Sequence, residues 1–302
     1  MRKTILAIAA ALTATIAFAQ TDSLTRGRTL CHQEIPDTLT TPASRNKWLV
    51  QHYWDKFDFA DTTFLAHAET TEQGYVYFLG LLPRVSKASA AEGIRVLVDY
   101  IYKSGTESVR EYFATLADSW LGDNNSPMHD DVTYAQFLDI AAANKFANIA
   151  ERTRNRYMAR NLRKNLPGST AADFYYICRD GKRYNMHSTD AKYTLLYFYD
   201  PDCNHCRAVL KELLAIPQLT DSPAIHVLAV YPYGYDERWE TTGNTFPPSW
   251  TDGYSPDGEI NASDIYYIKE MPSLYLLDSE KRVILKNPTV TVLKEAIAGI
   301  DE

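Results

Sequence analysis

The chain has 302 residues, of which 45% are hydrophobic and 23% are charged. This length is sufficient for two domains, and the composition is typical of a folded globular protein, which excludes a disordered chain. The 38 acidic residues outnumber the 31 basic ones. This balance argues against a general nucleic-acid binder, because the phosphate backbone favours a basic protein surface.

The first 19 residues have the pattern of an export signal. Arg2 and Lys3 precede a short apolar run, and Ala17-Phe18-Ala19 has the small residues of a cleavage site. The run is shorter than the ~20 residues of a membrane-spanning helix, so we expect cleavage after Ala19, not an uncleaved anchor. Cleavage would remove two basic residues and no acidic ones, which leaves a net charge of −9. We therefore expect a periplasmic or secreted protein without a membrane span.

A polar, threonine-rich leader is predicted for residues 20–45, followed by an all-α domain at 46–165. Apolar residues recur at the spacing of one helix face in residues 94–101 and again in 109–120. Thr106 is expected to cap the second of these helices. A third, long helix is predicted after Thr133 and through Tyr157. Its arginine-rich end indicates a solvated face or, alternatively, contact with an acidic partner or membrane surface.

Pro167 and Gly168 end the helical pattern, and a second domain is predicted for residues 171–302. An Asp180-Gly181 turn follows its first strand, and residues 278–281 are expected to join its last two strands as a hairpin. The alternation of elements predicts an α/β domain with a mixed central sheet and flanking helices. Strands are predicted at 174–178, 193–199, 225–231, 273–277 and 282–286, and helices at 206–215 and 291–299.

Cys203 and Cys206 lie where an apolar strand ends and a helix begins. Haem attachment needs a histidine after the second cysteine, where Arg207 stands, and a zinc site needs further ligands at close spacing. A structural disulfide of this span would close only a small loop. A redox-active dithiol is favoured, because a helix N-terminus favours a Cys203 thiolate and Cys206, one turn later, can resolve a mixed disulfide. No metal or other cofactor is expected.

Residues 171–299 resemble an extracytoplasmic thioredoxin-fold domain of the TlpA/ResA-like kind. The resemblance is carried by three stretches, ADFYYICRDGKRYNMHS, YTLLYFYDPDCNHC and IYYIKEMPSLYLLDSEKRVILK. It implies that Pro272 is a cis-proline facing the dithiol and that the Met271 backbone pairs with a substrate strand. The helical stretch HYWDKFDFADTTFLAHAETTEQGYVYFLGLL resembles an N-terminal domain of unknown function found in bacterial envelope proteins.

Three residues beside the dithiol are expected to modify its chemistry. Asp202 stands where many relatives carry tryptophan, and its carboxylate would disfavour a neighbouring thiolate. His205 precedes the second cysteine, as in the strongly oxidising DsbA proteins, and a partly protonated imidazole would favour the thiolate. The alternative for His205 is an exposed helix residue. Tyr197 occupies the position of the buried acid of thioredoxin, so that proton shuttle is expected to be missing.

Two further features allow two interpretations each. Cys31 and Cys178 can form a disulfide in an oxidising compartment, or Cys178 is a buried free thiol. The aromatic loop that follows the strand at 225–231 either borders the dithiol as a peptide-binding rim or packs on its own aromatic side chains.

Together these patterns predict a thiol–disulfide oxidoreductase, with the reductase direction favoured by the resemblance. Its partners would be exported protein thiols or disulfides and a redox partner protein. The alternative is a non-catalytic partner-binding or envelope assembly protein whose thioredoxin-like scaffold carries a structural disulfide. A reactive Cys203 and a dithiol that cycles would distinguish the enzyme from the scaffold.

Overall fold

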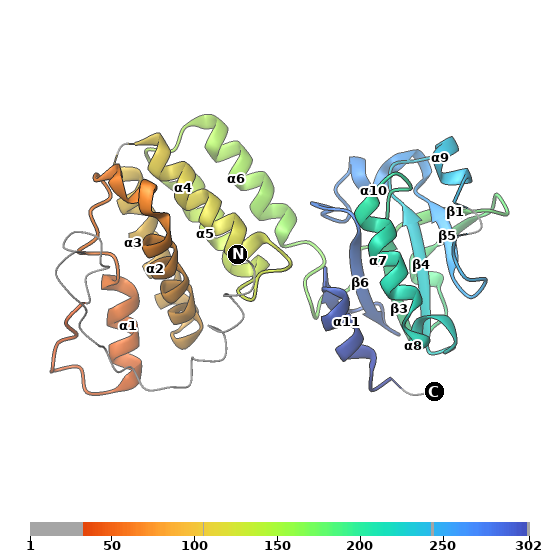
Figure 1. Ribbon diagram of the computed structural model, residues 1–302, viewed down its shortest axis with the longest axis horizontal. Coiled ribbons are helices and arrows are strands. Elements are labelled where there is room, and N and C mark those ends of the chain that lie inside the picture. Colours follow the sequence, from red (N-terminus) through yellow and green to blue (C-terminus); the bar gives the residue numbers. More distant parts are fainter. Residues whose placement is uncertain (1–32, 105, 243–244, 301–302) are drawn as a thin grey trace.

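The computed structural model describes residues 33–104, 106–242 and 245–300. The predicted signal peptide, the first part of the predicted leader and Cys31 lie outside the described residues. Figure 1 shows a group of helices followed along the chain by a sheet with its own helices. Along the described chain, no helix is both long and apolar enough to cross a bilayer.

The first part is an all-α domain whose core is rich in aromatic side chains. Trp54 lies edge-on to Phe57 and Phe113, with ring centroids 5.4 and 5.8 Å apart, an arrangement that favours aromatic pairs. Several of the helix N-termini are capped by polar side chains. Ser86, for example, accepts a hydrogen bond from the Ser89 N–H. The helices are α1 (Pro42–His52), α2 (Ala68–Leu81), α3 (Lys87–Lys103), α4 (Glu107–Ala117), α5 (Asp131–Ala143) and α6 (Ile149–Leu162).

Two predictions for the helical part are wrong. The long third helix is in fact two helices, α5 and α6, because Asn144 leaves the helical conformation and its side chain accepts from the Phe146 N–H. Asn148 then caps α6 in a capping box with Glu151. Thr106 does occupy the N-cap position of α4, but its side chain makes no capping hydrogen bond.

The second part is a seven-stranded mixed sheet with the strand order β2-β1-β5-β4-β3-β6-β7. The strands β3, β4 and β5 are parallel to one another, and the other neighbouring pairs are antiparallel. The strands are β1 (Tyr175–Cys178), β2 (Arg183–Asn185), β3 (Tyr193–Phe198), β4 (Ile225–Tyr231), β5 (Thr251–Tyr254), β6 (Ser273–Asp278) and β7 (Val283–Lys286). The predicted mixed sheet with flanking helices is confirmed.

Both faces of the sheet are buried, which explains the nearly continuous apolar sequence of its central strands. Successive residues of β3 point to opposite faces. Leu195 and Tyr197 pack with the helices α7 (Asn204–Leu214) and α11 (Val290–Ile297), whereas Leu196 and Phe198 pack with Phe174 and Tyr266 on the other face.

Strand β5 was not predicted, because it lies inside the aromatic loop and its sequence, TDGY, has little strand propensity. Its position comes from close packing. A Cβ atom at Gly253 would lie 2.9 Å from the carbonyl oxygen of Ile177 on β1, so only glycine allows the two backbones to approach. The short helices α8 (Pro217–Thr220), α9 (Glu237–Glu240) and α10 (Glu259–Ala262) complete the domain.

The helical part and the sheet are joined by buried contacts. Lys286 on β7 pairs with Asp131 at 2.8 Å and is only 4% exposed. Its ammonium also donates to the carbonyl oxygens of Leu162 and Lys164 at 2.7 and 2.9 Å. A buried ammonium is tolerated only when its hydrogen bonds are made in this way, so Lys286 requires the two parts to remain in contact.

Candidate active site

Cys203 is the N-cap residue of α7, immediately beyond the loop that follows β3. Its Sγ accepts a hydrogen bond from the Cys206 N–H at 3.1 Å, in the way that a serine or aspartate oxygen caps a helix. The side chain is half-buried and packs at the edge of the core. The N-terminal end of a helix attracts negative charge, so this position suits a cysteine that reacts as a thiolate.

Cys206 lies one turn later and is buried, with 2% exposure. Burial, followed by the hydrogen bond with Cys203, raises the pKa of the Cys206 thiol to about 12. The two cysteines therefore differ in access to solvent, and Cys206 remains a thiol at neutral pH. Such a pair provides one sulfur that incoming molecules can reach and a second that can attack only the first.

This asymmetry predicts selective alkylation of the reduced protein. At pH 8 a group with a pKa of about 12 is ionised in roughly one molecule in 10⁴, so iodoacetamide should modify Cys203 and leave Cys206 intact. In Cys203→Ser, modification of Cys206 should remain slow and rise about tenfold for each pH unit between 8 and 10. Peptide mass mapping against time provides the measurement. Equal labelling of the two cysteines at pH 8 would show that Cys206 is as reactive as Cys203 and would contradict this prediction.

The strand register brings Met271 and Pro272 close to the cysteine loop. Phe198, at the end of β3, pairs with Ser273, at the start of β6, so the residues before β6 lie beside the cysteine loop. The Met271–Pro272 peptide bond is cis, as the resemblance implied. The Cys203 thiol donates to the Met271 carbonyl oxygen at 3.6 Å. The carbonyl thus lies next to the sulfur where a substrate chain would arrive.

Asp202 and His205 are both exposed. Asp202 pairs with Arg238 at 3.1 Å, and this guanidinium also binds Asp236 and the Tyr231 hydroxyl. The arginine partly offsets the negative charge that Asp202 places beside Cys203. His205 makes no hydrogen bond with the other described residues, so its proposed effect on Cys203 would act through charge alone. Arg238 was missed from the sequence, because nothing in the aromatic loop marks it as a neighbour of Asp202.

Tyr197 stands where the resemblance predicts the buried acid of thioredoxin. Its hydroxyl donates to the Cys206 carbonyl oxygen at 2.8 Å, and burial raises the pKa of the tyrosine well above its usual value. A neutral phenol does not accept a proton in the way that a carboxylate does. In this structure Tyr197 instead holds the first turn of α7 against the sheet.

The aromatic side chains of the loop after β4 differ in burial. Trp239 and Trp250 are buried, and Phe246 packs on Tyr199 with ring centroids 5.1 Å apart. Tyr233, in contrast, is 43% exposed, and the pKa of its hydroxyl is raised by partial burial and then by Asp200 and the two cysteines. Such a charge effect requires proximity, so Tyr233 lies near the dithiol.

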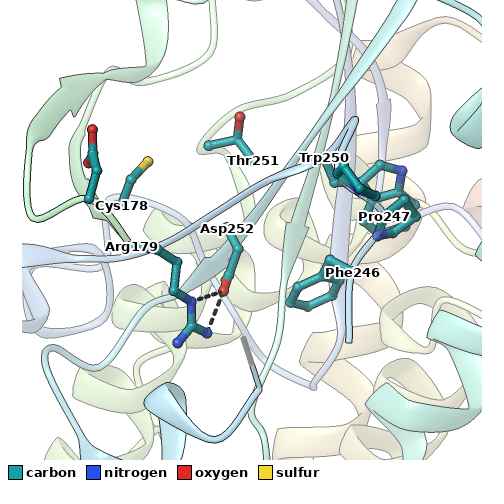
Figure 2. Close-up of a pocket in the computed structure, with 9 residues that line it drawn as sticks. Cys178, Arg179, Phe246, Pro247, Trp250, Thr251 and Asp252 are labelled. Atoms are coloured by element: carbon teal, nitrogen blue, oxygen red, sulfur yellow. Dashed lines mark hydrogen bonds and ion pairs between the residues drawn. The ribbon is translucent and has the colours of Figure 1, made fainter. Parts of the chain in front are cut away.

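A pocket of about 580 Å³ lies elsewhere, between β1, β5 and the aromatic loop. Figure 2 shows Arg179 and Asp252 joined across it, with Phe246, Pro247 and Trp250 on one side. Cys178 also lines this pocket, and burial raises the pKa of its thiol to about 11. Neither cysteine of the dithiol lines the pocket. The predicted Cys31–Cys178 disulfide stays a prediction, because Cys31 lies outside the described residues.

Comparison with known proteins identifies the two parts of the chain. Residues 10–165 match the family described as Domain of unknown function (DUF5106). A thioredoxin-like protein from Bacteroides caccae is 32% identical, and the match covers 91% of this chain and 99% of that one with a TM-score of 0.75. The chain belongs to this family of thioredoxin-like proteins with an N-terminal DUF5106 domain.

Other matches cover less of this thioredoxin-like protein. A conserved protein of unknown function from Bacteroides fragilis is 37% identical over 44% of this chain and 98% of its own, with a TM-score of 0.42. The thioredoxin domain of a thiol-disulfide oxidoreductase from Bacteroides vulgatus is 19% identical over 45% of this chain and 99% of its own, with a TM-score of 0.41. No curated protein matches the chain.

Proposed function

We propose that this protein is a thiol–disulfide oxidoreductase that acts as a reductase on exported proteins. The proposal rests on the proximity of two sulfur atoms and one backbone carbonyl. Cys203 caps α7, Cys206 lies buried behind it, and the Met271 carbonyl lies 3.6 Å from the Cys203 sulfur. A partly exposed attacking sulfur, a resolving sulfur and a backbone acceptor are the groups that disulfide exchange with a polypeptide requires.

In the reductive direction the Cys203 thiolate attacks one sulfur of a substrate disulfide. A bond forms between Cys203 and the substrate, and the other substrate sulfur leaves as a thiolate that takes a proton from water. Cys206 then attacks the Cys203 sulfur, and its proton passes to the second departing substrate thiolate. Two electrons have moved from the dithiol to the substrate, so a partner dithiol must reduce Cys203–Cys206 before the next cycle.

The high pKa of Cys206 supports this order of steps. A thiol that does not ionise in the free enzyme does not compete with Cys203 for the substrate. The predicted signal peptide and the thioredoxin-like relative from Bacteroides support export. The reductase direction is supported by the TlpA/ResA-like resemblance of residues 171–299.

The proposal is tested by an equilibrium titration of the protein in a dithiothreitol or glutathione redox series, with the Cys203–Cys206 state determined by mass. We expect one reversible two-electron transition that is absent in Cys203→Ser. A midpoint close to that of thioredoxin, about −270 mV, would support the reductase direction, and one near −120 mV would support an oxidase. A pair that remains oxidised below about −300 mV would instead indicate a structural disulfide and a binding or assembly protein.

A further inference from the structure

Residues 264–272 lie between α10 and β6 and have no regular secondary structure, and they include Met271, which contacts Cys203. We call these residues the approach segment. An irregular segment is held in place only by its side-chain and backbone contacts with its surroundings. Its conformation at Met271 therefore depends on which groups hold the preceding residues.

The first half of the approach segment is held by the end of α6 and the residues after it. Tyr157 donates to Asp264 Oδ1 at 2.9 Å, and Asn161 donates to Asp264 Oδ2 at 3.3 Å. Lys164 donates to the Asp264 carbonyl oxygen, and the Asn165 amide donates to the Ile265 carbonyl oxygen at 3.0 Å. These donors come from the end of the helical part, and their acceptors are the charged and backbone oxygens of the segment.

Two neighbouring tyrosines then enter different cores. Tyr266 is buried in the sheet domain, and its hydroxyl donates to the Ala172 carbonyl oxygen at 2.7 Å. Tyr267 packs against the core of the helical domain instead. The segment is therefore held between the two domains at this point.

The last contact before Met271 is made by Lys269. Its ammonium donates to Asp118 Oδ1 at 2.7 Å and to the Gly122 carbonyl oxygen at 3.5 Å. Both acceptors belong to the π-helix η5 (Asp118–Gly122), which follows α4. Tyr134 also donates to Asp118 at 3.0 Å, which fixes the carboxylate that Lys269 meets. Short π-helical turns are uncommon and frequently occur at functional sites.

We infer that the helical domain positions the substrate-facing backbone of the thioredoxin-like domain by holding the approach segment, with Lys269 and Tyr157 as positioning residues. The inference rests on the proposed function, because it takes Met271 to be the residue that pairs with a substrate chain. It assigns a role to the domain that matches DUF5106. A substrate that pairs with a pre-ordered backbone does not have to order it on binding.

The test uses the double variant Tyr157→Phe/Lys269→Met. It removes the Tyr157–Asp264 hydrogen bond and both hydrogen bonds of Lys269, while keeping the ring and the aliphatic stem. The matched control is Arg163→Met/Arg282→Met, which removes two exposed ion pairs, Arg163–Asp139 and Arg282–Glu280, one in each domain and neither on the segment. Each reduced protein is reacted with iodoacetamide and, separately, with a synthetic disulfide-linked peptide. Only the peptide needs the Met271 backbone.

We expect the rate constant for the peptide to fall about fivefold in the segment variant, while the rate constant for iodoacetamide changes less than twofold. Both rate constants should be unchanged in the control, and Lys269→Arg in the Tyr157→Phe background should recover part of the peptide rate. Equal rates in the segment variant and the wild type would overturn the inference. A parallel loss with both reagents would also overturn it, since that result indicates altered cysteine chemistry.

Hydrogen exchange separates this inference from the proposed function. Amide exchange in residues 264–272 should be faster in the segment variant and unchanged in the control, whether or not the wild type reduces a peptide. If the wild type is alkylated at Cys203 but never reduces the peptide, the proposed function fails. The amide exchange rates of residues 264–272 then show by themselves whether the helical domain holds the approach segment. Unchanged exchange in the segment variant would overturn that role.

Discussion

Cys203→Ser is expected to abolish disulfide reduction, with a fall in rate of about 10³-fold or more, because the reacting nucleophile is removed. Cys206→Ser should lose turnover as well, but it should accumulate a covalent Cys203–substrate disulfide. That intermediate forms in the first step and is not resolved without the second sulfur. Turnover is measured on a disulfide peptide with dithiothreitol as the electron source. The covalent intermediate is measured separately by intact mass, after reduced protein freed of dithiothreitol is mixed with the peptide, because dithiothreitol itself cleaves mixed disulfides.

Cys178→Ser is the matched control for both variants. Its sulfur is half-buried in the pocket of Figure 2 and is not part of the dithiol. We expect turnover within twofold of wild type. If Cys178→Ser lost activity as fully as Cys203→Ser, the assignment of the site would be wrong. Turnover by Cys203→Ser would likewise show that another group carries the reaction.

Arg179→Met is expected to lower the free energy of unfolding by about 3 kcal/mol, because it leaves a buried carboxylate without its charged partner. Asp252 is 9% exposed and receives two hydrogen bonds from the guanidinium, at 2.5 and 2.8 Å. The same guanidinium donates to the carbonyl oxygens of Trp239 and Glu240 and lies 3.7 Å from the centre of the Trp239 ring. Arg179, which follows β1 directly, therefore holds the aromatic loop in contact with the end of that strand.

Arg282→Met provides the control for this stability change. The Arg282–Glu280 pair lies in the same domain, but its side chains are 53% and 72% exposed. Exposed ion pairs contribute about 0–1 kcal/mol, so the loss should be below about 1 kcal/mol. Urea unfolding followed by far-UV circular dichroism would measure both variants. Similar losses in the two variants would show that Asp252 is well solvated without Arg179.

Both domains are proposed to determine the position of the Met271 carbonyl. The sheet places it, since the register that pairs Phe198 with Ser273 fixes the start of β6 beside the cysteine loop. The helical domain orders the residues that precede it, through the contacts of Asp264 and Lys269. A change in the helical domain would therefore reach the dithiol through the approach segment.

Local patterns in the sequence were sufficient for the central strands and for the position of the cysteine pair. They were not sufficient for β2, for β5 or for the break between α5 and α6. The central strands are continuous apolar runs because both faces of the sheet are buried, and this signal does not depend on distant residues. The position of Cys203 at a helix start also follows from neighbouring residues alone. The division of the chain near Pro167 stays a prediction that rests on the change of hydrophobic period there.

Only the tertiary structure decided which distant groups meet. β5 contains Asp252 and Gly253, and it became a strand because Gly253 allows close approach to β1, a contact that no local propensity encodes. Arg238 reaches Asp202, and Lys269 reaches Asp118, across 36 and 151 residues of chain. Such pairs involve ordinary surface-type residues with no local pattern. Their meeting is determined by the packing of buried faces, which brings their elements together.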